Sequence, residues 1–190
     1  ARGYACNPRT EVVAVADTDE EVRRLFCERF ECRGYETYEE MLKSEDLDIA
    51  APILSVRANA GAVTAAAQAG GRAIFCEKPL TARLADADAM IAACEQNDVV
   101  IAAGLVAKNR HVFWDAKRHI DAGIIGKMRC INIYCRNNQG GCHGINLARH
   151  FADYADVEWV IGWVSGDPHG DHEEAYEEGQ RSFGQIGGHI

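Results

Sequence analysis

The chain has 190 residues, and 47% of them are hydrophobic, which is enough to build one domain or one and a half. Its formal net charge of −9 argues against nucleic acid or an anionic membrane surface as a partner. No apolar run approaches the roughly 20 residues needed to span a bilayer, so we expect no membrane partner.

Strands and helices alternate along the first half of the chain. Short apolar runs predict strands, and longer stretches that follow capping signals predict helices. The expected strands are 11–16, 47–54, 73–76 and 99–103, and the expected helices run to about Phe30, to Lys43, over 58–69 and over 84–96. Alternation at this spacing is typical of a doubly wound parallel sheet in an α/β fold.

Local signals mark the ends of the first two helices. Thr18 and Glu21 have the spacing of a capping box, and Thr37 and Glu40 repeat it. Gly34 is expected to mark the end of the first helix. These signals favour two short helices separated by a turn.

The pattern changes after residue 106, where we place a domain boundary between 1–106 and 107–190. In the second part we expect a helix over 112–121, an alternating strand with one wet face over 128–135, a helix over 143–151, a strand over 158–164 and a loop over 167–178. This order predicts the start of an α+β domain, in which a helix covers a partly solvated sheet.

The stretch Ala73 to Leu80, which reads AIFCEKPL, carries most of the chemical information. Its apolar strand lacks polar alternation, so both faces should be covered, as in a parallel sheet. Ligands bind beyond the carboxyl ends of such strands, where Glu77 and Lys78 fall, and Pro79 prevents a helix from absorbing them. A lysine there can donate a proton or stabilise an oxyanion, or it can form a surface ion pair.

The sequence FCEKPL (75–80), followed by a helix rich in alanine and aspartate, resembles the Gfo/Idh/MocA family of glucose–fructose oxidoreductases and inositol dehydrogenases. The resemblance extends from about Glu11 to about Trp163. It implies a Rossmann-type dinucleotide-binding domain, NAD(P) as cofactor, and Lys78 between nicotinamide and substrate. The family opens with a strand and a glycine-rich phosphate loop ahead of residues 1–6, so we expect this chain to be an internal piece of a longer protein.

Asp17 ends the strand that lies beside the adenosine ribose in a dinucleotide fold. A carboxylate there accepts hydrogen bonds from the ribose hydroxyls and repels a 2′-phosphate, which favours NAD over NADP. Alternatively, Asp17 and Thr18 only cap the following helix. By the resemblance, the expected cofactor-binding residues are Asp17, Thr18, Ser55, Asn59, Glu77 and Lys78. For Ser55 and Asn59, a plain loop and helix cap is the alternative.

His143 follows a glycine pair in a stretch that resembles the family's second signature, a helix with a substrate-facing histidine. Many members carry an acid four residues earlier, where this chain has Gln139. His143 could still act alone as the acid/base for the hydroxyl proton, beside Lys78 as the second catalytic residue. The alternative is that His143 has no functional role, and for Asn146 and Arg149 we expect packing or surface positions.

The resemblance predicts an NAD(P)-dependent oxidoreductase that moves a hydride to or from a hydroxyl of a sugar, cyclitol or related polyol. The main alternative is a non-catalytic nucleotide- or sugar-binding relative, favoured by the missing glycine loop and by Gln139. At full length we expect a homo-oligomer in the cytoplasm.

A metalloprotein is the remaining alternative, suggested by eight cysteines and by His169, Asp171 and His172. No cysteine pair has C-x-x-C spacing, and the histidines fall in an acidic stretch without a fixed scaffold, so we expect no metal site. Reduced thiols are the better interpretation of the cysteines.

Overall fold

In the computed structural model, the chain separates into two units, Ala1–Ala103 and Gly104–Ile190. The structure describes residues 1–134, 138–164 and 186–189. The boundary that we predicted from the sequence lies at residue 106.

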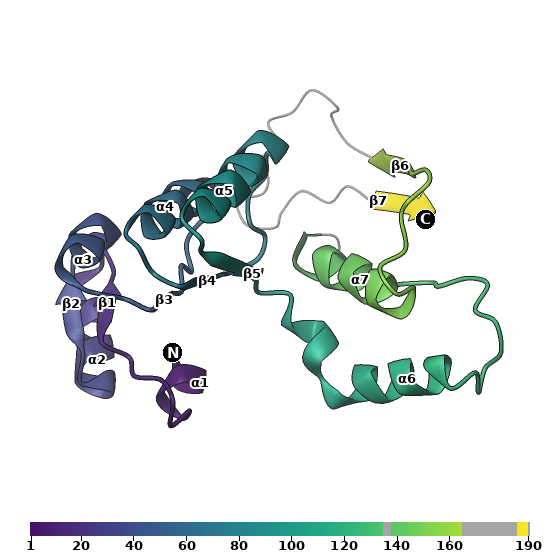
Figure 1. The fold of residues 1–190 in the computed structure, drawn as a ribbon, viewed down its shortest axis with the longest axis horizontal. Coiled ribbons are helices and arrows are strands. Elements are labelled where there is room, and N and C mark those ends of the chain that lie inside the picture. The colour runs from purple at the N-terminus through teal and green to yellow at the C-terminus, as the bar shows by residue number, and fades with distance from the viewer. Residues whose placement is uncertain (135–137, 165–185, 190) are drawn as a thin grey trace. The chain divides into compact units, whose positions relative to one another are not determined.

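The first unit alternates short strands and helices (Figure 1). Its elements are α1 (Arg2–Ala5), β1 (Ala14–Ala16), α2 (Glu20–Phe30), β2 (Arg33–Tyr35), α3 (Tyr38–Ser44), β3 (Ile49–Ala50), α4 (Val56–Gln68), β4 (Ala73–Cys76), α5 (Leu84–Gln96) and β5 (Val100–Ala103). All strand pairs in this unit are parallel, which confirms the predicted α/β class.

The strands form two sheets, one of β1 and β2 and one in the order β3-β4-β5. A dinucleotide-binding sheet has the strand order 3-2-1-4-5-6, with strands 2 and 3 on one side of strand 1 and strands 4, 5 and 6 on the other. The pair β1-β2 corresponds to strands 2 and 3, and β3-β4-β5 corresponds to strands 4, 5 and 6. Within the described residues, no strand lies between β1 and β3 and joins the two sheets by pairing with both. The unit is therefore an incomplete Rossmann-type sheet.

The hydrophobic core lies where α4 and α5 pack together over the β3-β4-β5 sheet (Figure 1). Val63, Ile74, Cys76, Met90 and Cys94 are each at most 2% exposed. By contrast, α2, α3, β1 and β2 contain no buried residue. Burial is thus concentrated in the half of the unit that carries the Glu77-Lys78-Pro79 turn.

Strand β4 is covered more fully on one face than on the other. Ile74 and Cys76 point to the buried face, whereas Ala73 and Phe75 are half-buried. Our expectation that both faces would be covered is therefore met on one face only within this unit. The long helices α4 and α5 supply that cover because their alanines allow close approach to the strand.

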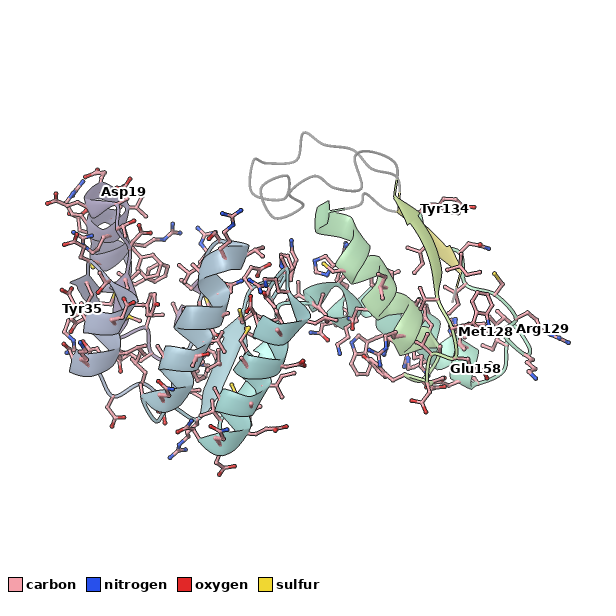
Figure 2. The ribbon with its side chains drawn as sticks, turned by 90° about the horizontal axis from the view of Figure 1, so that it is seen from above. Asp19, Tyr35, Met128, Arg129, Tyr134 and Glu158 are labelled. Carbon is pink, nitrogen blue, oxygen red and sulfur yellow. The ribbon has the colours of Figure 1, made fainter. Side chains whose placement is uncertain are left out.

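Helix α2 ends at Phe30 as predicted, but the residues at its two ends differ from the predicted cap and stop signals. Asp19, not Thr18, caps α2, because its carboxylate accepts a hydrogen bond from the Val22 amide (Figure 2). The C-cap residue is Glu31, which adopts a left-handed conformation with φ of 53°, and Gly34 instead lies in the unpredicted strand β2. The predicted Thr37 cap of α3 is confirmed by its hydrogen bond from the Glu40 amide.

The strand predicted over 47–54 shrinks to β3, which covers only Ile49–Ala50. Just before β4, the backbone at Gly71 passes close to the backbone at Leu47. A Cβ at position 71 would lie 2.8 Å from the carbonyl oxygen of Leu47, which explains the glycine there. Pro52 comes just after the strand, where its carbonyl takes part in the site described below.

The second unit contains the 3₁₀ helix η1 (Val106–Asn109), α6 (His111–Asp121), α7 (Asn138–Phe151), β6 (Ile161–Val164) and β7 (Ile186–His189). Strands β6 and β7 pair antiparallel, as expected for an α+β arrangement. The expected loop over 167–178 lies outside the described residues. No helix in the described ranges has the length and apolar character needed to cross a membrane.

The strand predicted from residue 128 is wrong for the described residues up to Tyr134, which form no regular structure. Tyr134 is 95% exposed, and Figure 2 shows it at the edge of this segment. Alternating polarity produces a strand only where a neighbouring strand pairs with it, and none of the described strands does so here.

Candidate functional site

The Glu77-Lys78-Pro79 turn follows β4 at the carboxyl edge of the β3-β4-β5 sheet, where ligands bind in open α/β folds. The Glu77 amide donates a hydrogen bond of 3.1 Å to the Pro52 carbonyl, which comes from the end of the neighbouring strand β3. This bond ties together the ends of two parallel strands. The turn is therefore part of the sheet edge and is not a free surface loop.

Lys78 is half-buried at this edge. In the part of the chain that the structure describes, its ammonium makes no hydrogen bond and no ion pair, so the surface ion pair that was the alternative for this lysine is not seen there. Its positive charge is available to a ligand at the strand ends.

Cys76, the residue before the turn, is fully buried. Burial, with a smaller effect of the Glu77 charge, raises the pKa of its thiol to about 11. The thiol stays protonated near neutral pH and is a poor nucleophile. Cys76 is therefore not a candidate nucleophile at this strand end.

Asn59 and Ser55, predicted to contact the cofactor, occupy different environments at the start of α4. Ser55 is the exposed N-cap residue, and its side chain makes no capping hydrogen bond. Asn59 is only 1% exposed, and its side-chain Nδ2 donates a 3.0 Å hydrogen bond to the Pro79 carbonyl. Asn59 is thus joined to the Glu77-Lys78-Pro79 turn from inside the protein, and Ser55 is the one of the two that a ligand can reach.

Asp17 directly follows β1, and its amide donates a 3.1 Å hydrogen bond to the carbonyl of Tyr35 in β2. One carboxylate oxygen accepts a 2.9 Å hydrogen bond from the Asp19 amide. No described residue bonds to the other oxygen, which suits a ribose hydroxyl. Thr18 is exposed beside it, and the Arg23 guanidinium donates to the Asp17 backbone carbonyl and fixes the loop from the helix side.

His143 lies in the second unit, on α7, which begins at Asn138. It is half-buried, and its Nδ1 is buried without a hydrogen-bond partner among the described residues. Asn146 Nδ2 and His150 Nε2 are also buried without a hydrogen-bond partner among the described residues. These residues follow His143 by three and seven positions, so all three lie on the same face of α7. The side chain of Gln139 lies outside the described residues.

The predicted site residues thus fall into three groups. Lys78 and Asn59 belong to one hydrogen-bonded cluster, Asp17 lies at the end of the other sheet, and His143 lies in the other unit. A small hollow near Leu42, Leu47 and Gly71 is at the opposite, amino end of β3 and β4, away from the Glu77-Lys78-Pro79 turn. No cluster of three or more metal-binding side chains occurs in the described ranges, and His169, Asp171 and His172 lie outside them.

Sequence reasoning missed two groups that shape these sites. The Pro52 carbonyl receives the Glu77 amide, and Arg23 holds the backbone of Asp17. A backbone carbonyl leaves no trace in side-chain patterns. Arg23 follows Asp17 by six residues, one helical turn beyond the cap, and this spacing is the only signal that could have revealed it.

Residues 1–105 match a family described as an oxidoreductase family with an NAD-binding Rossmann fold. The chain belongs to the Gfo/Idh/MocA oxidoreductase family. The match covers the whole first unit, including the strand end that carries Lys78, and it confirms the resemblance inferred from the FCEKPL sequence.

Curated relatives in the family act on sugars and cyclitols. Over 129 residues the chain is 31% identical to dTDP-3,4-didehydro-2,6-dideoxy-alpha-D-glucose 3-reductase of Streptomyces violaceoruber, covering 68% of this chain. It is 29% identical over 125 residues to myo-inositol 2-dehydrogenase of Thermotoga maritima, covering 65% of this chain. The chain spans 37% of the length of each relative.

Solved structures show the same fold. A probable dehydrogenase from Thermotoga maritima superposes with a TM-score of 0.74 at 24% identity, over 92% of this chain and 56% of its own. A 3-ketoreductase from Actinomadura kijaniata, solved with NADP and TDP-benzene, gives a TM-score of 0.62 at 25% identity over 68% of this chain and 39% of its own. Both solved structures thus share their fold with this chain.

Proposed function

We propose that the full-length protein is an NAD-dependent oxidoreductase that acts on a hydroxyl or keto group of a sugar, cyclitol or related polyol. The observation that carries this proposal is the half-buried Lys78 at the carboxyl edge of the sheet, whose ammonium has no partner among the described residues and whose turn is held by Pro52 and Asn59. Relatives that act on a dideoxy sugar and on an inositol support the substrate class.

In this proposal each residue has a distinct task. Lys78 donates a hydrogen bond to the reacting oxygen, lowers the pKa of a bound hydroxyl and stabilises the developing negative charge. Asp17 accepts hydrogen bonds from the adenosine ribose through the carboxylate oxygen that Asp19 leaves free. Bound NAD supplies the hydride acceptor. His143 takes up or returns the hydroxyl proton.

The direct test is an assay of the protein with a complete nucleotide-binding domain. NADH formation would be followed with a panel of inositols, hexoses and nucleotide-linked sugars, and NADH binding would be measured by fluorescence. Turnover of at least one polyol or sugar supports the proposal. Neither binding nor turnover with any of them contradicts it.

A non-catalytic relative that binds nucleotide or sugar is the second candidate. Gln139 favours it, because an amide replaces the acid that many family members place four residues before the histidine. The two candidates separate in the same assay, since the binding module holds NADH but does not oxidise any substrate.

Asp17 is expected to set the preference for NAD. A hydrogen bond to a charged group is worth about 1.5–3 kcal/mol, so Asp17→Ser should weaken NADH binding by about tenfold or more. The serine hydroxyl can still accept from the Asp19 amide, so the melting temperature should change little. Fluorescence titration with NADH and NADPH measures both affinities.

The exposed Asp46 provides a control, since Asp46→Ser removes the same charge from the surface of this unit. This variant should leave the ratio of the two affinities unchanged. Unmodified protein that binds NADPH at least as tightly as NADH would remove Asp17 from this role.

His143 is expected to contact the reacting hydroxyl of a bound substrate. The motivating observation is the Nδ1 of this half-buried histidine, which has no hydrogen-bond partner among the described residues and which a substrate could bond. A crystal structure with NADH and a substrate analogue would test it, and a His143 directed away from that analogue would exclude it from proton transfer.

A further inference from the structure

Asn59 differs from the rest of the buried surface of α4. The other buried residues of this helix are valines and alanines, and among the described residues Asn59 is the polar residue of the core, with 1% exposure. A buried amide destabilises a protein unless its polar atoms are bonded. Oδ1 has no partner among the described residues, so Nδ2 supplies the one described side-chain hydrogen bond, to Pro79.

That hydrogen bond reaches the residue directly after Lys78. Its acceptor, the Pro79 carbonyl, is 3.0 Å from Nδ2, and the two residues are 20 positions apart. On the other side of Lys78, the Glu77 amide is bonded to the Pro52 carbonyl at 3.1 Å. Lys78 is thus held between two hydrogen bonds that come from different elements, one from the end of β3 and one from α4.

We propose that Asn59 is a positioning residue, which sets the backbone of Lys78 so that its ammonium faces the reacting oxygen. This inference rests on the proposed function of Lys78 and adds a group that acts on it without touching the ligand. For folding alone, an apolar side chain of similar volume would fit among the valines and alanines of α4. The amide is explained by the bond to the turn.

Placement of a catalytic group has a large effect on rate. A shift of about 1 Å at a reacting group, caused by a change elsewhere, can lower the rate by about 10²-fold. Asn59→Leu removes the donor and keeps a similar volume. We expect it to lower kcat by about 10-fold to 100-fold, with little change in KM or in the affinity for NADH.

Asn59→Asp adds a pH-dependent readout. Its carboxylate would place an oxygen opposite the Pro79 carbonyl, and burial raises the pKa of such a carboxyl group. Protonation restores an O–H donor. The loss of kcat relative to unmodified protein at the same pH should therefore shrink as the pH falls, which a purely volumetric role for this side chain does not predict.

Val63→Ala is the matched control, because Val63 lies one turn further along α4 and is 0% exposed. The experiment compares kcat, melting temperature and hydrogen exchange at the amides of Glu77, Lys78 and Leu80 for all three variants, in protein with a complete nucleotide-binding domain. Faster exchange at these amides in Asn59→Leu, but not in Val63→Ala, is the expected result, together with the selective loss of kcat.

Two results would overturn the positioning role. One is an Asn59→Leu variant that turns over as fast as Val63→Ala, and the other is unchanged exchange in the turn. If no sugar or polyol is turned over even by unmodified protein, the proposed function fails, and hydrogen exchange alone still decides the role of Asn59. If Asn59→Leu does not fold, the pH dependence of exchange in Asn59→Asp decides it.

Discussion

Replacing Lys78 with alanine is expected to lower kcat by about 10²–10³-fold, or roughly 3–4 kcal/mol of transition-state stabilisation. The reason is the position of its ammonium, half-buried at the strand ends and free of partners in the described part of the chain. The surrounding backbone is set by β4 and by the Glu77–Pro52 hydrogen bond, so truncating the side chain should leave the sheet intact. NADH should still bind.

The measurement is steady-state kinetics of an active form of the protein, beside its melting temperature. Lys43→Ala is a suitable control, because Lys43 is an exposed lysine in the last turn of α3. It should match unmodified protein in both measurements. Unchanged turnover in Lys78→Ala would refute the catalytic role, and a large drop in melting temperature would make Lys78 a structural residue instead.

The second substitution with a large expected effect, here on the free energy of unfolding, is at Ile74 in the centre of the three-stranded sheet. Its side chain is 2% exposed and belongs to the core cluster between β4, α4 and α5. Ile74→Ala removes three buried carbon atoms and leaves a cavity, so the free energy of unfolding should fall by about 2–5 kcal/mol. That is a large share of the roughly 5–15 kcal/mol by which domains are stable.

Urea unfolding followed by circular dichroism measures this difference. Val100→Ala is the control on the neighbouring strand β5, since Val100 is 68% exposed and its truncation should change stability by no more than about 0.5 kcal/mol. Equal losses in the two variants would show that the core does not lie where the burial places it.

The elements predicted best from the sequence are those whose signals lie within the element itself. The apolar run of β4 (Ala73–Cys76) and the span of α5 (Leu84–Gln96) agree with the structure at both ends. Strand β2 was missed because Arg33–Tyr35 is short and carries no apolar run, and it forms only by pairing with β1. The strand predicted from residue 128 failed for the opposite reason, since its pattern has no partner in the described residues.

The candidate site divides in the same way. The place of Lys78 follows from an apolar strand that runs into Glu77 and Pro79, so it could be predicted. The contact between Asn59 and Pro79 could not, because it depends on how α4 is rotated and packed against the turn. Sequence patterns gave Asn59 the role of a cofactor ligand, whereas its 1% exposure places it behind the turn.

The uneven burial within the first unit has a consequence for nucleotide recognition. The elements β1, α2, β2 and α3, which present Asp17, contain no buried residue. Segments with few buried contacts open at low free energy, so in this chain we expect this half to open more readily than the half that holds Lys78. If Asp17 binds adenosine as proposed, nucleotide binding would select the ordered form, and the apparent affinity would be scaled by the fraction of molecules in which that form exists. Nucleotide capture and the ordering of this half would then be a single coupled equilibrium, whereas the strand end that carries Lys78 would not have to order first.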